Sequence, residues 1–502
     1  MAPSKVESHR VSSRLLRYGL LTVCIAIALV LAVAFERWRA RSIAAPQIHA
    51  IIVLPLHNNS GDPSQQYLAD GMTEELIAEL GKISALRVIS ITSSKNFGSS
   101  QNRFPEISRK LGVDGVVDGS VAREGDQIRI TAQLIDARTG RGLWKNEYVR
   151  GMASALDLQS QMAREIAEQI RTKVTPEEQA RLTPARPISA EAQDLYLQGR
   201  YFLDRGSSER EAIGYFEKAI EKDAFFAPAY AGLAASYNYL GQAGSINYSE
   251  AYSKAKAAAE KAIVIDPELA DAHAALAYSL IDLDWDWTDA GREFRRALEL
   301  NPNSGPVHSA YALYLARLGR SSEAMEEAER GLQLDPISLN AHHMVAYCYY
   351  GARQFDKALD QIRKASDLNL VTPDSWLHWT MGIIYRDKGS YKKAIEQFQV
   401  LGANPHYLGH LGNAYARDGQ VTQARRIIAE LKKNVRHDGV GTYEIALIYA
   451  GLGDKEAAFA WLERSYKVHD KGLTYLKMDP CMDPLRHDGR LQDLMHRVGL
   501  AG

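Results

Sequence analysis

The sequence predicts a multidomain protein with an N-terminal transmembrane helix, then a small α/β domain, then an all-α solenoid of helical repeats. Three observations support this fold class. The chain has 502 residues, about three times the usual length of one domain. An uncharged apolar run lies near its start. Small residues recur about every 34 positions in its second half.

Composition excludes several functional classes. Apolar residues make up 46% and charged residues 24% of the chain, and 60 Lys and Arg nearly balance 61 Asp and Glu. This is ordinary globular composition, and its charge gives no attraction for nucleic acid. The three cysteines are too few and too scattered for a disulfide framework or a zinc ribbon. We therefore expect no nucleic-acid partner.

Residues 18–35 carry no charged side chain, and a helix of this length reaches about 27 Å, close to the thickness of a bilayer core. Charged residues and Trp38 follow at once, as in an interface anchor. We expect an uncleaved transmembrane helix, residues 1–17 as a cytoplasmic tail, and the rest of the chain across the membrane. A removable signal peptide is the alternative, because Ala32-Val33-Ala34 fits a cleavage site.

Residues 48–175 predict a small α/β domain. The run Ile51–Leu54, ended by Pro55, is typical of a buried strand. Three later strands joined by tight connections predict an antiparallel meander, and the mixed order of elements predicts one sheet with helices packed on it. The expected strands are 51–54, 87–91, 116–121, 127–136 and 143–149, and the expected helices are 70–81, 105–111 and 156–174.

Several short motifs mark this domain: Gly61-Asp62-Pro63, Asp70-Gly71-Met72-Thr73-Glu74-Glu75, Gly119-Ser120-Val121, and 131–136 with Thr139-Gly140. With them, the region closely resembles the TolB amino-terminal-like domain of bacterial sensor and regulator proteins. The resemblance covers about a quarter of the chain. It implies an interaction or sensing module without catalytic residues. Leu143-Trp144-Lys145-Asn146 departs from the family, which usually has an acidic residue before the aromatic or basic pair.

Residues 191–466 repeat themselves, after a proline-containing linker at 176–190. A second series of small residues precedes four of the recurring alanines by 12 positions. Small residues let the two helices of a hairpin approach closely, and the period resembles that of the tetratricopeptide (TPR) repeat. We count seven or eight hairpins. The recurring alanines are Ala290, Ala324, Ala358, Ala394, Ala424 and Ala457, and the preceding residues are Ala312, Ala346, Gly382 and Gly412.

The end of the chain, 467–502, resembles the short tail that follows such arrays in the same kind of protein. We expect it to act as a C-terminal cap, because its apolar side chains can cover the exposed end of the last hairpin. These side chains are Met478, Met482, Leu485, Leu491, Leu494 and Met495.

The first helices of stacked hairpins line the concave side of a solenoid. A groove rich in Tyr, Trp and Arg suits the binding of an extended peptide. Core packing is the alternative for some of these residues, since periodicity alone does not separate the two. The inward-pointing candidates are His343, Tyr347, Tyr350, Trp379 and Arg386.

Other patterns favour structural roles. The acids of 284–289 lack the glycine and distal glutamate of a calcium loop, so we expect a helix-capping turn there. His342-His343 and the pair His406 and His410 have no glutamate of an HExxH motif. Phosphate-binding loops and known nucleophile motifs do not occur. We therefore expect no catalytic residue, no metal, no cofactor, and a chain that is not an enzyme.

The leading hypothesis is a bacterial inner-membrane scaffold or sensor module, with its soluble part in the periplasm. It would bind a protein or peptide through its solenoid and α/β domain. Similar architectures often carry a winged-helix or nucleotide cyclase domain first, but only 17 residues precede the predicted span, so we expect neither. Two alternatives remain open: a sensory subunit of a signalling or transcription-regulating system with its output on another chain, and an enzyme with an unrecognised site in the α/β domain.

Overall fold

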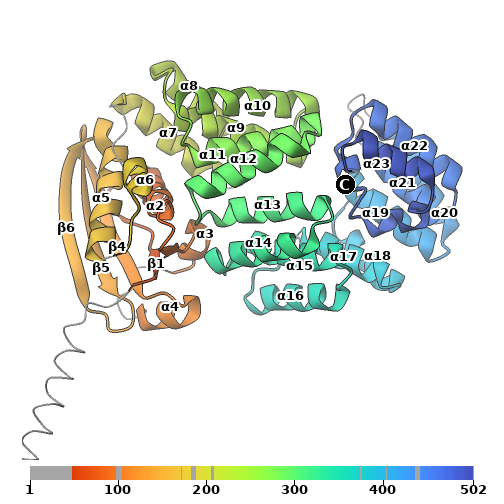
Figure 1. Cartoon of the computed structure of the whole chain (residues 1–502), viewed down its shortest axis with the longest axis horizontal. Helices are drawn as coiled ribbons and strands as arrows, with labels where there is room; N and C mark the ends of the chain where they lie inside the picture. Colours follow the sequence, from red (N-terminus) through yellow and green to blue (C-terminus); the bar gives the residue numbers. More distant parts are fainter. Residues whose placement is uncertain are drawn as a thin grey trace, which may run out of the picture. The chain divides into compact units, whose positions relative to one another are not determined.

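The computed structural model describes residues 48–97, 104–170, 172–182, 188–204, 208–372, 376–402, 404–435 and 441–500. The predicted tail 1–17 and transmembrane helix 18–35 lie outside these residues. Within the described ranges, no helix combines the length and the apolar character that crossing a bilayer requires. Ile48–Gly502 forms one compact unit, in which a small N-terminal sheet is followed by an all-α solenoid (Figure 1).

Six strands form one sheet in the described part of the chain, in the order β3-β1-β4-β5-β6, with β2 paired to β4. β1 runs parallel to β3 and β4, whereas β4, β5 and β6 form the expected antiparallel meander. A two-residue strand such as β2 gives no periodic signal, and the sequence does not predict it. The strands are β1 Ala50–Val53, β2 His57–Asn58, β3 Arg87–Val88, β4 Gly115–Glu124, β5 Gln127–Asp136 and β6 Gly142–Gly151.

Helices cover both faces of this sheet. Alternate residues of β1 enter two separate apolar clusters, one shared with α2 and α5 and the other with α4. In the segment 176–190, predicted as a linker, α6 begins with a capping box of Thr175 and Glu178, and Leu182 is fully buried. The helices are η1 Pro63–Gln65, α2 Gln66–Gly81, α3 Ile91–Ser94, α4 Phe104–Leu111, η3 Met152–Ser154, α5 Ala155–Gln169 and α6 Pro176–Arg181.

The short motifs of the α/β domain form turns and close contacts. Asp136 Oδ1 accepts hydrogen bonds from the backbone N–H groups of Arg138 (3.0 Å) and Thr139 (2.8 Å), which fixes the turn between β5 and β6. A Cβ atom on Gly119 would lie 2.1 Å from the carbonyl oxygen of Thr131 on β5. Local backbone geometry therefore accounts for these two motifs in this chain.

The solenoid consists of eight consecutive hairpins in the described residues, α7 to α22 (Figure 1). The helices are α7 Ala190–Leu203, α8 Glu209–Lys222, α9 Ala227–Ala243, α10 Tyr248–Ile265, α11 Ala270–Ser279, α12 Trp287–Leu300, α13 Gly305–Arg317, α14 Ser321–Leu334, α15 Leu339–Gly351, α16 Phe355–Asp367, α17 Leu377–Asp387, α18 Tyr391–Gln399, α19 Pro405–Arg417, α20 Val421–Asn434, α21 Thr442–Gly451 and α22 Lys455–Lys467.

Five of the six recurring alanines, from Ala290 to Ala424, are fully buried between the helices of their hairpins. The sixth assignment is wrong by one residue: Ala457 is half-buried, whereas Ala458 is fully buried. Asp454 caps α22 by accepting from the backbone N–H of Ala457 (3.0 Å), which sets the start of the helix and its register.

The motif at residues 70–75 joins the α/β domain to the solenoid. A Cβ atom on Gly71 in α2 would lie 2.8 Å from Leu197 Cδ2 in α7, so only glycine allows this approach. Tyr196 OH donates to Glu75 Oε1 (2.6 Å), and Arg200 Nη2 donates to Glu74 Oε2 (3.2 Å). Helix α2 and the first hairpin are thus joined by buried polar contacts at Glu74 and Glu75.

The buried contact between Glu74 and Arg200 should make the stability of the protein depend on pH. Burial raises the pKa of Glu74 from 4.5 to about 7, although Arg200 opposes the shift. Because the folded-state pKa is raised, the stabilising effect of the proton is present below pH 4.5 and is lost as the pH rises toward 7. The wild type should therefore lose stability between pH 5 and pH 8, and Glu74→Gln should not lose it. The free energy of unfolding of Glu74→Gln minus that of the wild type should increase by about 2 kcal/mol over this range.

Urea titrations of both proteins at the two pH values measure this change. Glu299→Gln is the matched control, because the Glu299 side chain is 65% exposed. A difference between Glu74→Gln and wild type that stays constant across this pH range would contradict the prediction.

Candidate functional site

The structure brings together all five residues of the predicted groove, on α15 and α17. Ring centroids lie 5.3 Å apart for His343 and Tyr347, 5.7 Å for Tyr347 and Tyr350, and 5.6 Å for Tyr347 and Trp379. Arg386 Nη2 donates to the Tyr350 hydroxyl at 3.2 Å. The repeat pattern therefore identified neighbours that are up to 43 residues apart in the sequence.

Three of these five side chains are core residues. Tyr347, Tyr350 and Arg386 are 6%, 2% and 0% exposed. Arg386 Nη2 donates to Asp387 Oδ2 (2.8 Å), and its Nη1 lies 2.8 Å from His410 Nδ1. Core packing, the alternative that the sequence left open, accounts for them, because a buried and fully engaged guanidinium offers no donor to a ligand.

The C-terminal segment, residues 470–500, covers the same face of the first helices. It contains η5 Lys471–Tyr475, η6 Pro480–Leu485 and α23 Gly489–Arg497. Asp479 Oδ2 accepts from the hydroxyl of Tyr443 in α21 (3.1 Å), and Tyr475 accepts from Arg317 in α13. The segment therefore reaches well beyond the last hairpin that the predicted cap 467–502 was expected to cover. All six apolar side chains predicted for the cap are buried.

This segment also meets the early hairpins. Trp287 Nε1 donates to the carbonyl oxygen of Val498 (2.8 Å), and Lys471 Nζ donates to that of Gln242 (3.3 Å). These contacts join residues more than 200 positions apart in the sequence. Periodicity reports only neighbouring elements, so sequence reasoning missed that the chain fills its own inner face.

An aromatic patch remains beside the C-terminal segment; it consists of His343, Trp376, Trp379 and His406. Trp376 is 36% exposed, and its ring lies 4.3 Å from that of His343. Three ring nitrogens of this patch have no hydrogen-bond partner among the described residues: Nδ1 and Nε2 of His343, and Nε1 of Trp379. Burial lowers the pKa of His343 to about 3, so its ring is neutral at physiological pH. These three nitrogens are themselves buried, so the exposed part of the patch consists of the rings of Trp376 and His406.

Histidines elsewhere in the solenoid hold hairpins together. His273 Nδ1 lies 2.6 Å from Glu293 Oε2, and its Nε2 lies 3.0 Å from the carbonyl oxygen of Pro267. His342 makes the equivalent contacts to Gln361 (2.9 Å) and Pro336 (3.2 Å). The repeat spacing of these histidines was the signal available in the sequence. Within the described ranges, no three potential ligands gather as a metal site.

The acidic stretch 284–289 lies where the sequence predicts a turn. Trp285 adopts a left-handed conformation with φ +54° between η4 (Leu280–Asp284) and α12. Asp286 Oδ1 accepts from the backbone N–H of Asp289 at 3.0 Å and caps α12. The acids therefore serve the helix start, as expected.

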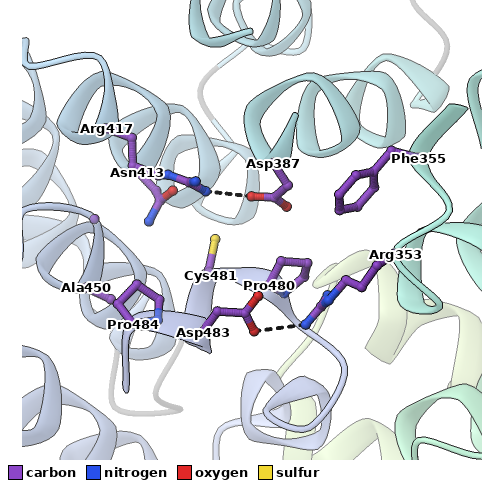
Figure 2. A pocket seen from close by; sticks show the side chains of 11 residues that line it. Arg353, Phe355, Asp387, Asn413, Arg417, Ala450, Pro480, Cys481, Asp483 and Pro484 are labelled. Atoms are coloured by element: carbon purple, nitrogen blue, oxygen red, sulfur yellow. Dashed lines mark hydrogen bonds and ion pairs between the residues drawn. The ribbon is translucent and has the colours of Figure 1, made fainter. Parts of the chain in front are cut away.

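A cavity of about 420 Å³ lies between the C-terminal ends of α17, α19 and α21, the turn after α15, and the C-terminal segment (Figure 2). Arg417 Nη1 donates to Asp387 Oδ1 (2.7 Å), and Arg353 Nη2 donates to Asp483 Oδ1 (2.9 Å). Sequence analysis missed this cavity because helix ends from four hairpins build it. The lining residues are Arg353, Phe355, Asp387, Asn413, Arg417, Ala450, Gly451, Pro480, Cys481, Asp483 and Pro484.

One family model, the tetratricopeptide repeat, matches residues 443–468, which form most of the last hairpin. Together with the eight consecutive hairpins, this match shows that the chain contains TPR repeats. Proteins with such repeats mediate protein–protein interactions. The likeness to a TolB amino-terminal domain and the membrane anchor remain predictions.

Among curated proteins, putative adenylate cyclase 3 of Rhizobium meliloti (strain 1021) is 38% identical over 193 residues. The match covers 38% of this chain and 33% of the relative. Superkiller protein 3 of Schizosaccharomyces pombe is 24% identical over 194 residues, which cover 37% of this chain and 14% of the relative. The chain thus spans a third or less of the length of these relatives.

The cyclase-named relative contradicts the prediction that this chain is not an enzyme. That prediction is wrong because it was drawn from missing motifs. A missing known motif excludes one arrangement of residues, and it leaves other catalytic arrangements open.

Solved structures of TPR proteins resemble parts of the chain. The Pseudomonas aeruginosa PilF structure is 23% identical and covers 41% of this chain and 91% of its own, with a TM-score of 0.32. The PilW structure, described as a type IV pilus biogenesis factor, is 21% identical and covers 44% of this chain and 96% of its own, with a TM-score of 0.35. Scores at this level assign no function.

Proposed function

We propose that the protein is a scaffold or sensor module that binds a protein partner, or a peptide segment of one, through the aromatic patch. The observation that carries the proposal is the exposed pair of aromatic rings, Trp376 and His406, which contact the rings of His343 and Trp379. Aromatic side chains that combine apolar area with a polar tip are the usual anchors of protein interfaces.

The patch also limits what the partner segment looks like. Trp376 and the edge of the His406 ring favour an apolar or proline-containing side chain in that segment. The partner contacts the aromatic patch and not the inner face of the solenoid, which the C-terminal segment fills. In this proposal the α/β domain adds a second contact surface, and residues 18–35 anchor the module in the bacterial inner membrane.

A photo-crosslinking experiment tests the proposal. Replacing Trp376 by a photoreactive phenylalanine in the native host should give a discrete adduct with a partner protein. Adding Trp379→Ala should reduce that adduct at least about tenfold, because truncation of an aromatic anchor costs about 2 kcal/mol or more.

Tyr239→Ala is the matched control, because Tyr239 is an exposed aromatic residue (52%) on another hairpin. It should leave the adduct unchanged, and thermal melting should confirm that both variants fold. An adduct that survives Trp379→Ala, or crosslinks confined to this chain, would exclude the patch as the docking surface.

The cyclase-named relative favours a second candidate function, in which this module belongs to a nucleotide cyclase system. The assay is conversion of ATP to cyclic AMP by the purified chain with magnesium or manganese. Turnover that depends on the chain would support this candidate. An inactive chain that also fails to change the rate of a co-purified cyclase would oppose it.

A further inference from the structure

The cavity of Figure 2 contains a buried acceptor that lacks a donor. Asn413 is 1% exposed, and its Nδ2 donates to the carbonyl oxygen of Leu447 at 2.6 Å. That carbonyl only accepts, so it fixes the orientation of the amide. Among the described residues, Oδ1 of Asn413 has no hydrogen-bond partner. Buried acceptors are rarely left in this state.

The equivalent asparagine of an earlier hairpin, Asn238 in α9, has the donor that Asn413 Oδ1 lacks. Asn238 Nδ2 donates to the carbonyl oxygen of Ala275 (2.9 Å), and Asn238 Oδ1 accepts from Ser279 Oγ (3.1 Å). Ser279 lies four residues after Ala275, and the residue four positions after Leu447 is Gly451. Gly451 lines the cavity and has no side chain that can donate. The donor that the early hairpin supplies internally is therefore missing where the cavity lies.

The walls of the cavity carry charges of both signs. Asp387 accepts from Arg386 and Arg417, and Asp483 accepts from Arg353 (2.9 Å) and Arg486 (2.6 Å). The C-terminal ends of three helices also point their partial negative charge toward this region. A ligand that carries one positive and one negative group matches this mixture of acids and bases better than a ligand with a single charge.

We propose that the cavity binds a free α-amino acid with an apolar side chain. Its ammonium group donates to Asn413 Oδ1, and its carboxylate accepts from Arg417, which lies one turn further along α19. Its side chain lies against Phe355 and Pro480. The volume of about 420 Å³ is within the range of small-ligand pockets, whereas an extended hexapeptide is about 20 Å long.

Calorimetric titration of the full chain with L-leucine tests the assignment. We expect saturable binding, at least about tenfold weaker for 4-methylpentanoate, which lacks the ammonium group, and for isoamylamine, which lacks the carboxylate. Arg417→Gln should weaken leucine binding by about tenfold or more, and Asn413→Leu by a similar factor. Arg292→Gln, a 60% exposed arginine on α12, is the control and should not change the affinity.

A second readout locates the bound ligand. Cys481 lines the cavity, and its thiol points toward the wall that carries Asp387, Asn413 and Arg417 (Figure 2). Cys481 and Cys348 are both buried, and only Cys481 lines the cavity. Leucine should slow the alkylation of Cys481 by iodoacetamide and leave that of Cys348, the internal reference, unchanged. Absence of leucine binding, equal affinity for the two truncated analogues, or no protection of Cys481 would overturn the proposal. A hexapeptide that binds the cavity as tightly as leucine would also overturn it.

Discussion

Replacing Gly382 by tryptophan should destabilise the solenoid by at least about 3 kcal/mol, because α17 and α18 touch at this glycine. A Cβ atom at position 382 would already lie 2.5 Å from Phe398 Cε1, and Phe398 is 1% exposed. The phenyl ring cannot move away without opening the packed hairpin. We expect a lower melting temperature and reduced helical ellipticity.

Gly214→Trp is the matched control. Gly214 lies inside α8, and nothing lies within 4 Å of a Cβ atom built on it. The same substitution should therefore cost far less there. Equal melting curves for the two variants would mean that the assigned hairpin register is wrong.

Replacing Asp387 by alanine should cost about 3–5 kcal/mol, because it leaves a buried guanidinium without its partner. Asp387 accepts from Arg386 Nη2 (2.8 Å), Arg417 Nη1 (2.7 Å) and Tyr350 OH (2.9 Å). Burial alone would raise the pKa of Asp387, but Arg386 and Arg417 outweigh it and hold that pKa below its usual range. The only other carboxylate oxygen near Arg386 in the described residues belongs to Asp479, at 3.9 Å.

Urea unfolding followed by circular dichroism measures the loss. Asp356→Ala is the control, because Asp356 pairs with Lys388 on the surface and its side chain is 88% exposed. Exposed pairs contribute about 0–1 kcal/mol. A similar, small effect of both substitutions would show that Arg386 finds other partners when Asp387 is removed.

The sequence predicts the hairpins well because their signal is local and steric. Ala346 and Gly382 sit where two helices touch, so the repeat period identifies both the hairpins and the neighbours of His343 and Trp379. The period does not distinguish an open groove from a filled one. Tyr347 satisfies the pattern of an inward-facing residue, and it lies under the C-terminal segment.

Two features could not be predicted, each for a physical reason. The cavity depends on helix ends from four hairpins and on Cys481, and no short motif joins them. The register of α22 depends on one cap at Asp454, and the adjacent pair Ala457-Ala458 gives two equally small candidates. Tertiary contacts decide such cases, and a single sequence does not contain them.

Hydrogen exchange of the full chain tests most directly whether the solenoid fills its own inner face. The amides of residues 471–485 and 489–497 should exchange as slowly as those of α15 and α21, because they share one apolar core. Fast exchange throughout 471–497, with slow exchange kept in α15 and α21, would show that the inner face is open and that this account of the binding surface is wrong.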